Sequence, residues 1–248
     1  MATTCLNCGA EIQHQFCPYC GQKNDVEKLN WHSLVHEIAH FFTHIEKGFL
    51  NTSFQLLIRP GRVLKEYLEG KRKKYHKPVS FYLIWAAIRL VTFTFVIGLM
   101  HYENFRSGNA IFGSKEEATY IVKHNQVFGL LLVPIQSFFI WIIVSRPKLN
   151  YIETLTVSIY ASAIVEMLIF FQIFIVGLLL QTNFLTNSFV YQVQVVYTSW
   201  TFFCLMDLFK KDRIKFLPLR AILVLIITFL VYQILAHVIA GFIMELKH

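Results

Sequence analysis

The stretch TLTVSIYASAIVEMLIFFQIFIVGLLL, Thr154 to Leu180, contains one charged residue, Glu166, in an otherwise apolar and small-residue sequence. A helix needs about 20 mostly apolar residues to cross a bilayer, where its backbone N–H and C=O groups must be satisfied within the segment. The stretch is long enough to do so. We therefore predict that Thr154 to Leu180 is a transmembrane helix.

The rest of the chain indicates the same class of protein. Of its 248 residues 55% are hydrophobic, and the mean hydropathy is +0.50. Four further spans are predicted: Val79 to His101, Asn125 to Ser145, Ser188 to Phe209 and Leu217 to Met244. The span from Ser188 has the lowest hydropathy, because it contains Gln192 and Gln194. The sequence thus predicts an all-α membrane protein with five transmembrane helices in residues 79–248, and no cleavable signal peptide.

The distribution of Lys and Arg predicts the orientation. Residues 1–78 hold eleven of the 23 basic residues, whereas residues 102–124 hold three, accompanied by three glutamates. Basic residues favour the cytoplasmic side of a membrane. We expect a cytoplasmic N-terminus and, after five spans, a C-terminus on the periplasmic or extracellular side of a cell inner membrane. The net charge of +8 then faces anionic lipid, and we predict no nucleic-acid partner.

Four cysteines near the N-terminus have the spacing of a metal site. Cys5 and Cys8 form one C-x-x-C pair, Cys17 and Cys20 form a second, and each pair is followed by a glycine. Four thiolates surround Zn²⁺ tetrahedrally at about 2.3 Å. The sequence predicts a zinc ribbon in residues 1–24 with one structural zinc ion, because four protein ligands leave no open position for substrate.

Two alternatives to zinc remain at this site. Two disulfides would need an oxidising compartment, whereas the charge distribution predicts a reducing cytosol. A rubredoxin-like iron site would use the same ligands. The segment also resembles the short zinc-ribbon modules that precede membrane domains in many bacterial proteins, through its C-x-x-C-G, its central Phe16 and its C-P-x-C-G.

Residues 25–78 are predicted to form cytoplasmic amphipathic helices and a basic juxtamembrane segment. Apolar residues recur at helical spacing from Trp31 to Leu50, and a second helix is expected after Arg59-Pro60-Gly61, with Gly70 as its C-cap. Basic residues then precede the first span, and we predict that they contact lipid headgroups: Lys71, Arg72, Lys73, Lys74 and Lys77. The alternative is that they only orient the protein.

The segment HEIAH, His36 to His40, matches the H-E-x-x-H pattern of zinc metallopeptidases. In those enzymes the two histidines bind zinc and the glutamate activates a water molecule. A third ligand is required, for which His44, Glu46 or Glu166 are candidates. Histidines recur every four positions here, so the alternative is an ordinary polar helix face.

Two charged residues lie inside predicted spans. Arg89 is near the middle of the first span and Glu166 near the middle of the third, and both spans run in the same direction. At 1.5 Å per residue the two charges reach about the same depth. We predict an intramembrane Arg89–Glu166 ion pair, which acts either as a structural brace or as a gate or transport site. Asp207, at the cytoplasmic end of the fourth span, is predicted to have no special role.

The segment from His44 to Trp85 resembles the membrane family known as domain-of-unknown-function family 3667. The resemblance rests on the following residues: Gly48, Phe49, Leu50, Thr52, Arg59, Pro60, Gly61, Tyr67, Gly70, Lys71, Arg72, Tyr75 and Pro78. It implies a bacterial membrane protein and no particular activity. The five spans and the sequence TLTVSIYASAIVEML are also similar to Yip-type membrane proteins, which implies a trafficking or scaffold role.

These observations predict a non-enzymatic membrane adaptor or scaffold, with a ribbon that binds a cytoplasmic protein partner. One alternative is a small transporter or channel built around Arg89 and Glu166. Another is a zinc metallopeptidase that uses HEIAH. The chain contains neither a glycine-rich phosphate loop nor a nucleophile elbow. Anionic lipids are predicted partners, and an oligomer is compatible with the sequence.

Overall fold

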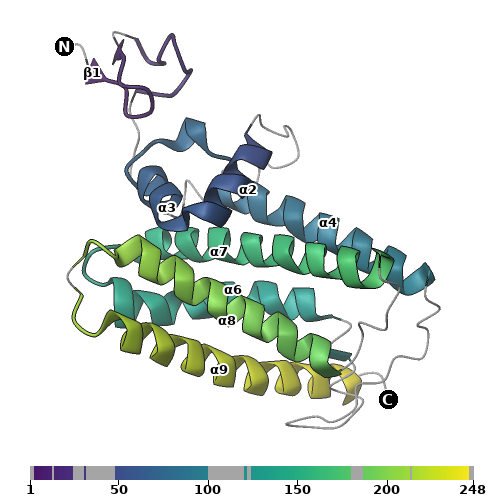
Figure 1. Ribbon diagram of the computed structural model, residues 1–248. Coiled ribbons are helices and arrows are strands. Elements are labelled where there is room, and N and C mark those ends of the chain that lie inside the picture. Colours follow the sequence, from purple (N-terminus) through teal and green to yellow (C-terminus); the bar gives the residue numbers. More distant parts are fainter. Residues whose placement is uncertain are drawn as a thin grey trace.

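The chain forms a helical bundle with a small cysteine-containing module at one end, as the computed structural model in Figure 1 shows. The structure describes residues 3–12, 14–24, 31, 48–99, 120–121, 124–179, 187–212 and 214–245. The elements are β1 (Thr3–Thr4), β2 (Glu11–Ile12), α2 (Phe49–Ile58), α3 (Pro60–Leu68), η1 (Arg72–Lys74), α4 (Pro78–Leu99), α6 (Asn125–Ile140), η2 (Trp141–Ser145), α7 (Tyr151–Gln172), η3 (Ile173–Leu179), α8 (Asn187–Phe209) and α9 (Leu217–Glu245).

Among the described residues, four helices are long and apolar enough to cross a membrane. They are Arg72–Val96, Gln126–Ser145, Tyr151–Gly177 and Leu217–Glu245. The helix α8 occupies the fourth predicted span and has 23 residues, but it is not among these four. Its Gln192 accepts a hydrogen bond from Gln172 of α7 (Nε2 to Oε1, 2.6 Å). A fifth span through α8 therefore stays a prediction.

The outer surface of the bundle is apolar. Large hydrophobic side chains point outward from α4, α6 and α9, among them Leu90, Val91, Phe95, Val127, Leu131, Leu219, Ile226, Val238 and Phe242. A soluble monomer rarely exposes apolar patches of this extent. Lipid satisfies such side chains, so this is the surface expected of a membrane protein.

The helix α7 lies at the centre of the bundle, in contact with α4, α6 and α8. Its residue Tyr160 is fully buried, and the Tyr160 hydroxyl donates a hydrogen bond to the carbonyl of His76, just before α4. Phe81 of α4 packs against Tyr160, with ring centroids 5.9 Å apart. This cluster fixes the start of α4, and hence the basic segment before it, onto α7.

The helices α2 and α3 form a layer between the cysteine module and the bundle. Pro60 occupies the first turn of α3, where its missing N–H costs no hydrogen bond. The apolar stripe of α3, which includes Val63, Leu64 and Tyr67, is buried in the main hydrophobic core. This stripe therefore packs on protein, and the layer is part of the folded bundle.

One contact brings the backbones of α3 and α8 close together. Gly61 donates its N–H to the Asp207 carboxylate (N to Oδ2, 2.7 Å), and a Cβ built at Gly61 would lie 2.6 Å from the backbone N of Leu208. Asp207 thus satisfies an N–H of the first turn of α3, which has no partner within its own helix. The prediction that Asp207 has no special role was wrong.

The helix predicted over Trp31 to Leu50 falls mainly outside the described residues, as do His36, Glu37, His40, His44 and Glu46 of the metallopeptidase hypothesis. Its first residue, Trp31, and its last three, Gly48 to Leu50, are described. Phe49 and Leu50 begin α2, because Gly48 precedes them with a φ of 127° that a continuing helix does not allow. The predicted end of that helix was therefore wrong.

Candidate functional site

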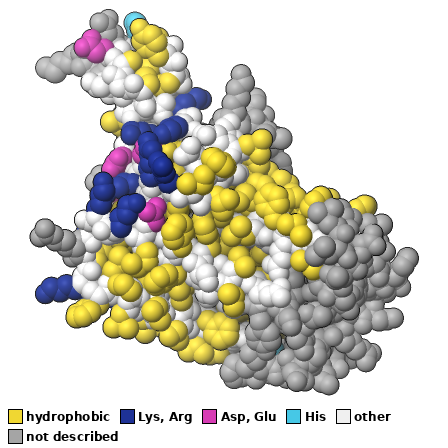
Figure 2. Space-filling model, in the orientation of Figure 1, with side chains coloured by type: hydrophobic (Ala, Val, Ile, Leu, Met, Phe, Trp, Pro, Cys, Tyr) yellow, Lys and Arg dark blue, Asp and Glu magenta, His cyan; other side chains and the backbone are white. Residues whose placement is uncertain are grey.

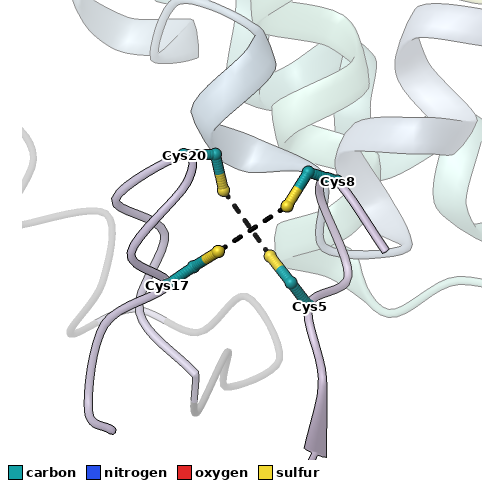
Figure 3. Close-up of side chains that lie close together, drawn as sticks. All are labelled: Cys5, Cys8, Cys17 and Cys20. Carbon is teal, nitrogen blue, oxygen red and sulfur yellow. Dashed lines mark hydrogen bonds between the residues drawn. The ribbon is translucent and has the colours of Figure 1, made fainter. Parts of the chain in front are cut away.

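The four cysteines of the N-terminal module converge on one point, as Figure 3 shows. Their sulfur atoms all lie within 4.8 Å of one another, and the Cys5–Cys20 and Cys8–Cys17 sulfur distances are both 3.6 Å. A disulfide would bring two sulfurs to about 2.05 Å. Tetrahedral coordination with bonds of about 2.3 Å places sulfurs about 3.8 Å apart. The arrangement therefore fits a tetrahedral metal ion.

Two matching turns place these cysteines. In each turn the glycine after the C-x-x-C pair donates its N–H to the carbonyl of the first cysteine, Gly9 to Cys5 and Gly21 to Cys17, both at 2.8 Å. Both glycines have positive φ, 79° and 70°. A side chain is strained in that conformation, so the two glycines allow the turns to close around the sulfurs.

Neighbouring thiols shift one another's ionisation. Burial opposes the ionisation of Cys5, but backbone hydrogen bonds from Cys8 and Asn7 and the adjacent thiols outweigh it and lower its pKa to about 7. A backbone hydrogen bond from Ala10 favours ionised Cys8, but burial and the three other thiols outweigh it and raise its pKa to about 12. Ionised thiolates repel one another, and a bound cation would remove that repulsion.

The module is held to the rest of the protein through Gln22, which is buried. Its amide Nε2 donates to the carbonyl of Gly70 at 2.9 Å, and its Oε1 accepts from the backbone N–H of Lys73 at 3.2 Å. Both ends of one side chain are thus used to bind the turn after α3. Gln22 lies two residues after Cys20, and its carbonyl accepts a hydrogen bond from the Cys17 N–H at 2.8 Å, so the metal site and this turn are directly connected.

A carboxylate that the sequence analysis did not identify organises the basic segment. Glu66 of α3 lies 2.7 Å from Lys74 Nζ and 2.9 Å from Arg62 Nε, and it accepts a hydrogen bond from Tyr75 at 2.7 Å. Burial alone would raise the pKa of Glu66, but hydrogen bonds from Lys74, Tyr75 and Arg62 outweigh it and lower the pKa to about 2. Glu66 therefore stays ionised at neutral pH.

The Glu66 carboxylate pairs with two of the five basic residues that were predicted to contact lipid headgroups. Lys74 and, at 3.8 Å, Lys71 share the charge of Glu66. Arg72 lies over the Tyr67 ring, 6.0 Å from its centroid. Lys73 is exposed and Lys77 is half-buried. Contact between these residues and lipid headgroups stays a prediction.

Inside the bundle, Arg89 of α4 and Glu166 of α7 form an ion pair, and both side chains are buried. A cavity of about 90 Å³ lies beside them. Its lining combines this pair with the polar side chains of Tyr82, Ser162, Gln194, Tyr197 and Tyr232. The cavity is partly open and most of its lining is apolar, and a space of this size has room for a few water molecules or a small ligand. The function of the pair stays a prediction.

Gln22, Glu66 and the Gly61–Asp207 contact were not identified from the sequence. Their partners lie far along the chain, and no local periodicity indicates them. Within the described residues, the sequence offers two local signals for these contacts. They are Gly61, which follows Pro60, and Glu66, a charged residue among the buried residues of α3.

Comparison with known proteins gives one match. No curated protein and no solved structure matches this chain. The similarity to zinc-ribbon modules and to Yip-type proteins stays a prediction. The resemblance to the family of unknown function is confirmed from just before α2 into α4, because residues 46–90 match the family described as Protein of unknown function (DUF3667).

Proposed function

We propose that this chain is a non-enzymatic membrane adaptor whose four-cysteine module holds one structural zinc ion and binds a cytoplasmic protein. One observation carries the proposal: the module exposes large apolar side chains. Leu6 is 49% exposed, Phe16 54% and Tyr19 81%. Exposed aromatic residues on a rigid support are typical of the energetically dominant contacts in protein interfaces.

The position of the module favours protein over lipid as its partner. Figure 1 places the module on the far side of the α2–α3 layer from the long apolar helices of the bundle. The basic turn that Gln22 binds lies between the two. Anionic headgroups gather at basic residues, so the module extends beyond them into water.

Zinc is the metal that best fits the donor set. Four thiolates in a tetrahedral arrangement favour Zn²⁺ or iron, and the predicted cytosolic location excludes stable disulfides. Because the four cysteines fill a tetrahedral coordination sphere, the ion has no position for a substrate. Its role is to hold together a module that has no hydrophobic core of useful size.

Metal analysis of the purified full-length protein tests the first half of this proposal. We expect one zinc per chain in the wild type, its loss in Cys17→Ser, and its retention in His36→Ala. A second zinc that is lost only with His36 would instead support the metallopeptidase, for which Glu37→Gln should abolish proteolysis. Iron, or no metal in the wild type, would contradict the zinc site.

Photo-crosslinking in cells tests the second half. A benzoylphenylalanine at Tyr19 should form one discrete protein adduct, and the same label at Glu11, also exposed on the module, serves as the control. The Tyr19 adduct should disappear in Cys17→Ser, because metal loss unfolds the module. An absence of protein adducts at Tyr19 in the intact protein would contradict the adaptor.

The cavity beside Arg89 and Glu166 favours a second candidate, a small transporter or channel. Polar groups inside a membrane protein often line the path of an ion or proton. Proteoliposomes loaded with a pH-sensitive dye measure this directly. A transport site predicts a proton flux that Arg89→Met with Glu166→Leu abolishes, whereas a brace predicts no flux in either protein.

A further inference from the structure

The helix α2 has an apolar outer face. Its four exposed hydrophobic side chains are Leu50 (75% exposed), Phe54 (62%), Leu57 (38%) and Ile58 (51%). Residues spaced by four, seven and eight positions lie on one side of a helix. These side chains therefore form a single stripe along α2, which we call the α2 outer face.

The opposite side of α2 is buried and carries polar as well as apolar residues, with Leu56 in the main hydrophobic core and Phe49 packed against it. Thr52 accepts a hydrogen bond from the His76 backbone N–H at 2.9 Å, and Ser53 accepts one from the Trp85 indole at 3.1 Å. A helix on a water-soluble protein buries its apolar residues and exposes its polar ones. The helix α2 instead exposes large apolar residues along its outer side while it buries Thr52 and Ser53, which is the pattern of a helix whose outer side contacts lipid.

Basic residues lie at both ends of this helix. A Cβ built at Gly48, just before α2, would lie 3.8 Å from the carbonyl of Lys74, so the start of α2 adjoins the basic turn that includes Lys73. At the other end, Arg59 follows α2 directly and is exposed. Figure 2 shows basic side chains gathered between the module and the bundle, with patches of hydrophobic side chains nearby.

We propose that α2 is an interfacial helix that binds the anionic lipid surface of the cytoplasmic leaflet. The α2 outer face enters the boundary between headgroups and acyl chains, and Lys73 and Arg59 contact headgroup phosphates. Ten residues span about 15 Å, so the two basic ends contact different lipids. The binding surface is thus a strip of the leaflet, held by apolar burial and by charge.

This inference rests on the proposed membrane anchoring and deepens it, because it names the lipid class and the side chains that bind it. It does not depend on the protein partner of the cysteine module. Labels at two different positions therefore separate the two ideas: Tyr19 reports the protein partner, and Phe54 reports lipid.

Photo-crosslinking of the full-length protein in proteoliposomes of phosphatidylglycerol and phosphatidylcholine tests the apolar contact. With benzoylphenylalanine at Phe54 we expect a phospholipid adduct, identified by its mass. The same label at Tyr19 should give none. A Phe54 label that reacts within the chain, with a second copy of it, or not at all would overturn the proposal.

Charge substitutions test the second contact. Native mass spectrometry of the detergent-solubilised protein gives the retention of phosphatidylglycerol and of phosphatidylcholine. We expect Lys73→Gln and Arg59→Gln each to lower phosphatidylglycerol affinity about fivefold and to leave phosphatidylcholine unchanged. Lys211→Gln, an exposed basic residue after α8, is the matched control. Equal effects in all three variants, or no effect on phosphatidylglycerol, would contradict the site.

Discussion

Single residues hold the α2–α3 layer to the rest of the protein. Glu66 gathers Arg62, Lys74 and Tyr75 around one carboxylate, and Gly61 allows α3 to meet the end of α8. Each contact involves only a few atoms, and both Glu66 and Gly61 are buried. Changes at either residue should therefore affect stability more than changes at the exposed residues beside them.

We expect Glu66→Gln to lower the free energy of unfolding by about 2 kcal/mol, since hydrogen bonds to a charged group contribute about 1.5–3 kcal/mol. Thermal unfolding in detergent measures the effect. Glu69→Gln, an exposed glutamate three residues away, should change stability little. Equal losses in the two variants would show that the Glu66 contacts are not stabilising.

The same carboxylate predicts a dependence on pH. Its pKa is lowered from 4.5 to about 2 by folding, so the folded state favours the ionised form. This contribution to stability is complete above about pH 4.5 and is lost as the pH falls toward 2. Unfolding curves of the wild type should show this loss, and those of Glu66→Gln should lack it.

Gly61→Ala should destabilise the protein by about 1–3 kcal/mol or more, because the added methyl group would lie against the backbone of α8. A helix backbone cannot give way as a flexible side chain does. Gly98→Ala in α4 is the control, since nothing lies within 4 Å of a Cβ at that position. Unfolding temperatures that fall equally in both variants would contradict a close α3–α8 contact.

At the scale of whole elements, capping residues determine where a helix begins, and hydrogen bonds between distant segments determine where a module lies. The helix α7 begins at Tyr151, three residues before the predicted start. The reason is a capping box, in which Asn150 accepts from the Glu153 N–H and Glu153 accepts from the Asn150 N–H, each at 2.8 Å. Hydropathy alone does not detect such polar first turns. The cysteine module is likewise positioned by one polar side chain, Gln22.

Gln22→Ala should release the cysteine module from the turn after α3 while leaving the metal site intact. Hydrogen–deuterium exchange measures this, because the Lys73 N–H loses its acceptor and should exchange faster. Gln15→Ala, an exposed glutamine on the same module, should leave the exchange of Lys73 unchanged. If the zinc content falls together with the protection of the Lys73 N–H from exchange, the Gln22 contact and the metal site would be one folding unit.

At the scale of the whole molecule, the buried Arg89–Glu166 pair joins α4 to the central helix α7. Removing one partner leaves an unpaired charge in the bundle, at a cost on the order of 3–5 kcal/mol. We expect Glu166→Leu to lower the unfolding temperature strongly, and Arg89→Met with Glu166→Leu to recover most of it. A double variant as unstable as the single one would contradict a simple brace.

The features that could be predicted from the sequence are those that depend on neighbouring residues. The apolar stretches that become α4, α6, α7 and α9 were evident from length and hydropathy, because a helix in lipid satisfies its own backbone. The sulfur cluster likewise depends on two C-x-x-C turns of a few residues each, closed by Gly9 and Gly21. Such patterns need no knowledge of distant parts of the chain.

Contacts between distant segments required the folded chain. The partner of Gly61 is Asp207, the partners of Gln22 lie at Gly70 and Lys73, and Glu66 collects charges that the sequence alone assigned to lipid. The burial of the polar residues Thr52 and Ser53 in α2 is likewise explained only by hydrogen-bond donors on other segments. Each of these polar groups could pair with many distant residues, and the packing of the whole chain determines which pair forms. No periodicity in the local sequence encodes these pairs.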